Sequence, residues 1–157
     1  MSSRFAAVSV QSADFDPGIE IARLGTSADV GAVATFVGLV RGVTTPGQEP
    51  AVTALELEHY PGMTERSIAD IVELAEQRWT LGAVRVIHRI GRLAVGDRIV
   101  FVGVSSRHRG DAFAACEFIM DYLKTRAPFW KKEWNARDEA HWVDARDTDH
   151  TAAARWS

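Results

Sequence analysis

The stretch that decides the fold runs from Arg107 to Lys132 and reads RHRGDAFAACEFIMDYLKTRAPFWKK. Its centre, Asp111–Arg126, predicts a long helix that ends before Pro128, because the residue preceding a proline avoids helical geometry. Upstream, Thr64 can cap a second helix that runs to about Trp79. The apolar face of this second helix consists of Ile68, Ile71, Val72 and Ala75. Two long helices, at about 64–79 and 111–126, are therefore expected.

Strands are expected around these helices. The run GAVATFVGLV at 31–40 is apolar and β-branched, as in a strand covered on both faces. Residues 53–59 alternate between apolar and acidic side chains, which is the period of a half-buried strand. The runs 84–90 and 98–104 predict a hairpin whose tight connection passes through 91–97. Further expected elements are a strand at 5–10, a helix at 14–24, and a last strand near Trp142 followed by a short tail.

The mixture of elements predicts the fold class α+β, with a mixed, mainly antiparallel sheet packed against the two long helices, because strands and helices do not alternate strictly. The 157 residues fit a single domain over 1–157. The segment 42–50 is rich in Gly, Thr and Pro and predicts an exposed, mobile loop. Arg41 lies at the hinge of that loop.

Composition excludes several classes of protein. The net charge of -3 argues against general binding to nucleic acid or acidic membranes, so any cationic site must be local. No apolar run approaches the ~18 residues of a membrane span, and the first ten residues lack the pattern of a signal peptide. The single cysteine, Cys116, cannot form an internal disulfide and fits a reducing compartment. The cytoplasm is the expected location.

Basic and titratable side chains gather at both ends of the predicted helix 111–126. They are Arg107, His108, Arg109, Lys124, Arg126, Lys131 and Lys132. Those before the helix lie where free backbone N–H groups and the helix dipole favour an anion. After the helix, a proline and two aromatic residues can anchor Lys131, and a desolvated or crowded lysine has a lowered pKa that suits a base or nucleophile. The simpler alternative is a set of solvated charges at two helix ends.

The length of this helix separates the two groups of cations. From Asp111 to Lys124 the helix rises about 20 Å, so His108 and Lys124 of one chain can hardly contact the same small substrate. Either they serve two sites, or two copies of the chain pack so that the helix start of one meets the helix end of the other. Because two-fold homodimers are the commonest oligomers, the second arrangement is favoured.

Other candidate sites are weaker. No Gly-rich nucleotide loop follows a strand, and the five histidines lack metal-ligand spacing with cysteine, so neither a metal nor a cofactor is expected. Cys116 lies inside the predicted helix beside apolar residues, which favours buried packing over nucleophilic chemistry. His59 and His88 are expected to be strand residues in polar contacts.

Four ordered motifs resemble one family. They are EHYPGMT at 58–64, VIHRIG at 86–91, SRHR at 106–109 followed by Ala112-Phe113, and DYLKTRAPFWK at 121–131. Together, over roughly residues 30–156, they resemble the large, catalytic subunit of molybdopterin synthase. The resemblance implies a sulfurtransferase of molybdenum cofactor biosynthesis that converts cyclic pyranopterin monophosphate into molybdopterin. It also implies a small ubiquitin-like partner, whose C-terminal Gly-Gly thiocarboxylate donates the sulfur, and a homodimer that becomes a heterotetramer with it.

The resemblance assigns roles to five residues. Lys124 and Lys131 would be the catalytic pair, with Lys124 in the essential acid/base or transient covalent role. Arg41, His108 and Arg109 would bind and orient the pterin and its phosphate. The rival hypothesis is a non-catalytic module that uses the same cations to hold a phosphate ligand or an acidic tail. A basic patch for nucleic acid is a third hypothesis, which the acidic overall balance weakens.

Overall fold

The computed structural model describes residues 7–42, 51–144 and 146–157. In chain order its elements are β1 (Val8–Gln11), α2 (Pro17–Leu24), β2 (Ala32–Leu39), β3 (Val52–His59), α3 (Met63–Arg78), β4 (Val84–Arg89), β5 (Gly91–Ala94), β6 (Arg98–Ser106), α4 (Arg109–Arg126), β7 (Phe129–Asn135), β8 (Ala140–Val143) and α5 (Asp147–Ala154). The predicted class, α+β, is confirmed. Among the described residues the strands form two four-stranded sheets, where the sequence predicted one.

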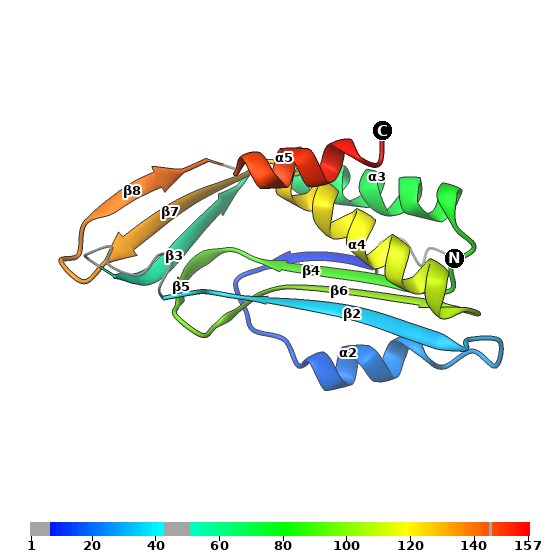
Figure 1. Cartoon of the computed structure of the whole chain (residues 1–157). Coiled ribbons are helices and arrows are strands. Elements are labelled where there is room, and N and C mark those ends of the chain that lie inside the picture. The colour runs from blue at the N-terminus through cyan, green and yellow to red at the C-terminus, as the bar shows by residue number, and fades with distance from the viewer. Residues whose placement is uncertain (1–6, 43–50, 145) are drawn as a thin grey trace.

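The first sheet has the strand order β1-β4-β6-β2, and helices cover both of its faces (Figure 1). Only β1 and β4 are parallel; β4 with β6 and β6 with β2 are antiparallel. Val86 and Val102 pack with α3 and α4 on one face, whereas Ile87 and Phe101 pack with α2 on the other. The central strands are therefore apolar on both sides, as expected for strands buried between two layers.

The second sheet has the order β5-β3-β7-β8 and is antiparallel throughout. It lies beside one end of the first sheet (Figure 1). A small core joins the two sheets, because Val40, directly after β2, is buried with Leu57 of β3 and Leu93 of β5. This junction holds the end of β2 against the strands of the second sheet.

The predicted hairpin is half right. Strands β4 and β6 pair antiparallel as expected, but their connection is not a tight turn, because Gly91–Ala94 forms β5 in the other sheet. Gly91 and Gly96 have φ angles of 88° and 90°, which let the chain leave one sheet and return to it. The path of the chain through β5 buries Leu93, which is 1% exposed.

The two long helices are confirmed, with earlier starts at Met63 and Arg109. The prediction that Thr64 caps α3 is wrong. Gly62 occupies the cap position with φ 85°, and Glu65 accepts its N–H. Thr64 instead lies inside the helix, fully buried.

Other sequence predictions fall on the chain ends and the loop. The helix at 14–24 is confirmed as α2, which Asp16 caps through its carboxylate. The predicted tail contains a helix, α5, and the segment after α4 forms β7; neither was expected. Most of the predicted loop 42–50, and the start of the predicted strand 5–10, lie outside the described residues. No described helix has the length and hydropathy of a membrane span.

Candidate active site

Helix α4 carries the two groups of cations at its opposite ends. His108 and Arg109 are exposed at its start, and Lys124 is exposed in its last turn. The helix has 18 residues, which corresponds to about 27 Å. His108 takes the cap position but its side chain makes no capping hydrogen bond. The structure therefore does not bring His108 and Lys124 together within one chain.

Lys131 is the best defined of the predicted site residues. It lies in β7, where it faces Leu57 on one neighbouring strand and Val143 on the other, and its side chain is half-buried. Burial lowers the pKa of Lys131, and the charge of Lys124 lowers it further. The structure therefore brings Lys124 and Lys131 close enough for the charge of one to affect the other.

Arg41 is the predicted site residue that lies just after the end of β2. Arg41 is exposed and follows Val40, whose backbone is fixed by two hydrogen bonds. The Val40 N–H donates to Asp97 O (3.0 Å), and the Val40 carbonyl accepts the N–H of Gly96 (2.9 Å). Val40 packs on Leu57, and Leu57 is the cross-strand partner of Lys131. Arg41 thus lies directly after the small core that joins the two sheets.

A hydrogen bond fixes the chain between Lys124 and Lys131. The Thr64 hydroxyl donates to the carbonyl of Pro128 (2.9 Å) and accepts the N–H of Tyr60 (2.9 Å). The start of β7 is thereby tied to the start of α3. Sequence reasoning missed this role because Thr64 also fitted a capping position, and nothing in the sequence shows that its hydroxyl meets a residue 64 positions away.

His88 was not predicted to belong to the site, yet it lies beside it. Its ring stacks on Phe129 with 3.9 Å between centroids and 21° between planes. Burial lowers the pKa of His88 to about 4, with further lowering by the charges of Lys124, Lys131 and His59. Its Nδ1 lies 2.9 Å from the Arg89 carbonyl. Because a carbonyl only accepts, Nδ1 carries the proton and Nε2 is the bare nitrogen.

The predicted aromatic anchor is confirmed only in part. Phe129 anchors β7 through the stack on His88, but Trp130 is 48% exposed and does not bury itself beside Lys131. His59 lies 3.8 Å from the carboxylate of Glu65, a polar contact as the sequence predicted. The only signal in the sequence for His88 was its place in the motif VIHRIG.

Cys116 is buried, as predicted, and it is 6% exposed. Burial raises the pKa of its thiol to about 11, and Glu117 adds to this effect. Because the thiolate is the reactive form, this cysteine stays an inert thiol at neutral pH. Among the described residues no group of His, Cys, Asp and Glu could hold a metal ion.

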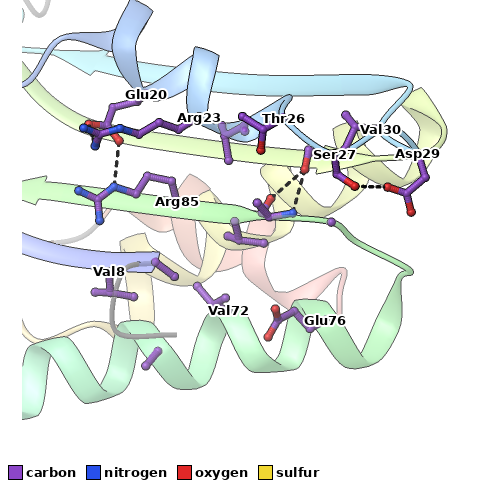
Figure 2. Close-up of a pocket in the computed structure, with 17 residues that line it drawn as sticks. Val8, Glu20, Arg23, Thr26, Ser27, Asp29, Val30, Val72, Glu76 and Arg85 are labelled. Atoms are coloured by element: carbon purple, nitrogen blue, oxygen red, sulfur yellow. Dashed lines mark hydrogen bonds and ion pairs between the residues drawn. The ribbon is translucent and has the colours of Figure 1, made fainter. Parts of the chain in front are cut away.

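A cavity of about 710 Å³ opens between α2, β4 and α3, and it contains none of the five predicted site residues. Several of its polar side chains bind one another (Figure 2): Arg85 Nε donates to Glu20 (3.0 Å), and Ser27 donates to Asp29 (2.6 Å). The Ser105 hydroxyl accepts the N–H of Ala83 (2.8 Å). These groups therefore have partners within the protein.

The fold and these side chains define a class of protein, an α+β domain with Lys124 and Lys131 in electrostatic reach of each other and a second cationic group one helix length away. Comparison with known proteins places it more narrowly. The profile of the MoaE protein family matches residues 10–126, and the chain belongs to this family. The resemblance inferred from the sequence is confirmed.

The relatives of the chain are enzymes. The molybdopterin synthase catalytic subunit of Vibrio cholerae is 57% identical over 149 residues, which are 95% of this chain and 97% of that protein. The Escherichia coli protein of the same name is 55% identical, over 90% of this chain and 92% of its own. The solved structure of molybdopterin cofactor biosynthesis protein E from Burkholderia multivorans matches with a TM-score of 0.79 and 51% identity, over 96% of this chain and 95% of that one. The predicted class of enzyme is confirmed by these relatives.

Proposed function

We propose that the chain is the catalytic subunit that converts cyclic pyranopterin monophosphate into molybdopterin with sulfur from the thiocarboxylate of a small ubiquitin-like partner. The observation that carries the proposal is the half-buried Lys131, with its lowered pKa, next to Lys124. An amine with a lowered pKa is more often neutral near pH 7, so it can take up a proton during sulfur transfer. Family membership supplies the substrate and the donor.

The two lysines have different surroundings, which supports different roles. Lys131 is fixed by the pairing of β7 on both sides, and it suits a base that must stay in place. Lys124 is exposed at the end of α4, where it can reach an incoming tail. We assign to Lys124 the essential acid/base or transient covalent step. Lys131 is its catalytic partner.

The sulfur donor must be a separate molecule. The chain has one cysteine, and that thiol is buried with its pKa raised to about 11. A partner tail that ends in Gly-Gly can enter a narrow site in extended form, because glycine has no side chain to exclude it. Two loaded tails are consumed for each dithiolene, since each tail carries one sulfur.

Arg41, His108 and Arg109 are proposed to bind the pterin and its phosphate. Arginine offers bidentate hydrogen bonds to phosphate, and His108 lies at a helix start, where an anion is favoured. His108 and Arg109 lie at the far end of α4 from Lys124, so they serve the site of a second copy in a homodimer. With two small partners, the assembly is a heterotetramer. The chain is proposed to be a single cytoplasmic domain.

Turnover with defined components tests the function. The purified chain, the cyclic pyranopterin and a thiocarboxylated partner should give the dithiolene product. Lys124→Arg should abolish product formation, because arginine stays protonated. If Lys124→Arg binds the pterin phosphate as the wild type does and the wild type gives no product either, the alternative of a non-catalytic binding module is correct.

Mixed subunits test the shared site. Lys124→Ala and His108→Ala chains should each be inactive alone. A heterodimer of the two keeps one intact site, so random mixing should restore about a quarter of wild-type activity. Verified heterodimers without turnover would contradict a site built from two copies.

A further inference from the structure

A pair of stacked rings connects the first sheet to the strand of Lys131. His88 belongs to β4, where it lies opposite Val10 of β1 and Val100 of β6. Its ring stacks on Phe129, the first residue of β7, with the two planes 21° apart. A central strand of the first sheet therefore contacts the strand of the second sheet that carries Lys131.

The stacked rings and Lys131 share one face of β7. Phe129 and Lys131 lie two positions apart, so their side chains point to the same side of the strand. Their cross-strand partners on β3, His59 and Leu57, lie on this face as well. The ring of His88 thus covers a face of the second sheet that reaches Lys131 about 7 Å farther along the strand.

A hydrogen bond fixes the orientation of the His88 ring. Its Nδ1 donates to the Arg89 carbonyl (2.9 Å). The Arg89 guanidinium in turn donates twice to the Ser12 carbonyl (3.1 and 3.0 Å) and once to the Arg98 carbonyl (3.0 Å). The imidazole is therefore held twice, in its plane by the hydrogen bond and on its face by Phe129.

An uncharged ring suits this position. Burial keeps the pKa of His88 at about 4, and the charges of Lys124, Lys131 and His59 also oppose its protonation. His88 is therefore neutral near pH 7. It covers the face of β7 without adding another cation beside the two lysines.

Exclusion of water is the main effect on the amine of Lys131. Burial is the largest cause of its lowered pKa, and the charge of Lys124 comes next. Among the weaker effects, Arg146 lowers this pKa further, whereas Asp149 and Glu133 raise it. A change that lets water reach this face of β7 would raise the pKa of Lys131, and the amine would be neutral less often.

We propose that His88 is a positioning residue of the reaction: stacked on Phe129, it closes to water the face of β7 that carries Lys131. This inference rests on the proposed function, in which Lys131 acts as a base. In this role His88 does not touch the substrate. It acts through Phe129 and Lys131, and its flat ring is the feature that matters.

The lysine content of the chain allows a direct test without any activity assay. There are three lysines, at 124, 131 and 132, so NMR of protein labelled with ¹³C-lysine follows the titration of each amine. His88→Ala removes the ring and should raise the pKa of Lys131. His88→Phe keeps a flat ring on Phe129 and should leave that pKa close to its wild-type value.

Ile87→Ala is the matched control. Ile87 is the neighbouring residue of β4, and it packs on the opposite face of the first sheet with Phe15 and Leu24. This variant also loses core packing, but the pKa of Lys131 should not change. If an alanine variant does not fold, His88→Val and Ile87→Val replace the pair, because valine suits a strand and has no flat ring.

Turnover shows whether the effect reaches the reaction. In His88→Ala, kcat at neutral pH should fall about 10- to 100-fold, with KM for the pterin nearly unchanged. The part of the pH profile in which the rate rises with pH should move to higher pH, because a base with a raised pKa becomes neutral at higher pH. Ile87→Ala should keep the wild-type profile.

Four results would overturn the proposal. They are an unchanged pKa of Lys131 in folded His88→Ala, an equal change in Ile87→Ala, a His88→Phe variant that behaves like His88→Ala, and a raised pKa with an unchanged pH profile of turnover. The expected NMR titrations in a wild type without turnover would instead overturn the proposed function and leave the closure of this face by His88 standing.

Discussion

The stacked histidine at the junction of the sheets gives a quantitative prediction about stability and pH. The pKa of His88 is about 4 in the folded chain, mainly because burial disfavours the charged ring, against 6.5 for an ordinary histidine. The unfolded chain therefore takes up the proton first as the pH falls. The stabilisation by neutral His88 is complete above about pH 6.5 and is lost progressively as the pH falls to about 4.

The size of the effect follows from the shift. A difference of about 2.5 pKa units corresponds to about 3 kcal/mol in the free energy of unfolding, of which about 2 kcal/mol is lost by pH 5. His88→Phe removes the titrating group and keeps an aromatic ring against Phe129. It also removes the hydrogen bond to the Arg89 carbonyl, which costs about 1 kcal/mol at every pH.

Urea unfolding between about pH 7.5 and pH 4.5 measures the difference between wild type and His88→Phe. The variant should be less stable than the wild type at neutral pH. Between neutral pH and pH 5 the wild type should lose about 2 kcal/mol more free energy of unfolding than the variant does. His150→Asn, at an exposed histidine of α5, controls for the loss of an imidazole in general. The charges of Lys124, Lys131 and His59 also act on His88, so the comparison is repeated in a His59→Asn background. A stability difference that does not change with pH would refute the reasoning.

Two further predictions concern the segments that hold the site residues. Thr64→Val leaves two polar groups without their partner, including the Pro128 carbonyl, and should destabilise the fold by about 2–3 kcal/mol. Thr64→Ser, which keeps the hydroxyl, should cost about 1 kcal/mol in the same urea titration; equal losses would contradict the role of the hydroxyl. Gly31→Ala would press a Cβ into the backbone carbonyl of Arg107 and should cost about 1–3 kcal/mol. A Cβ at Gly110 meets nothing within 4 Å, so Gly110→Ala is the control and should stabilise α4 by about 0.5 kcal/mol. If the melting temperatures of the two variants shift by the same amount in the same direction, the close approach at Gly31 is excluded.

The sequence predicted those elements whose pattern is long and local. Helices α3 and α4 were located to within one or two residues, because α3 carries a clear apolar periodicity over sixteen residues and Pro128 marks the end of α4. The split into two sheets was missed because β5 has four residues, and a glycine-flanked run of that length fits a turn equally well. Only the buried contact of Leu93 with Leu57 separates the two possibilities.

The candidate site shows the same limit. Lys124 and Lys131 were predicted from neighbouring positions in the chain, and the structure brings them within electrostatic reach. His88 lies more than thirty positions before Lys124, and its stack on Phe129 depends on the packing of β4 against β7, which no local pattern specifies. β7 itself was missed because FWKKEWN has aromatic and charged residues on both faces of the strand.

The length of α4 makes the proposed activity depend on protein concentration. The helix separates His108 from Lys124, so one copy cannot close the proposed site around a small substrate. In the proposed homodimer the second copy supplies His108 and Arg109, so dilution below the dimer dissociation constant would dismantle the site. Activity per chain should therefore fall at the concentration where the mass measured by sedimentation falls, and a monomer that keeps full turnover would contradict a site built from two copies.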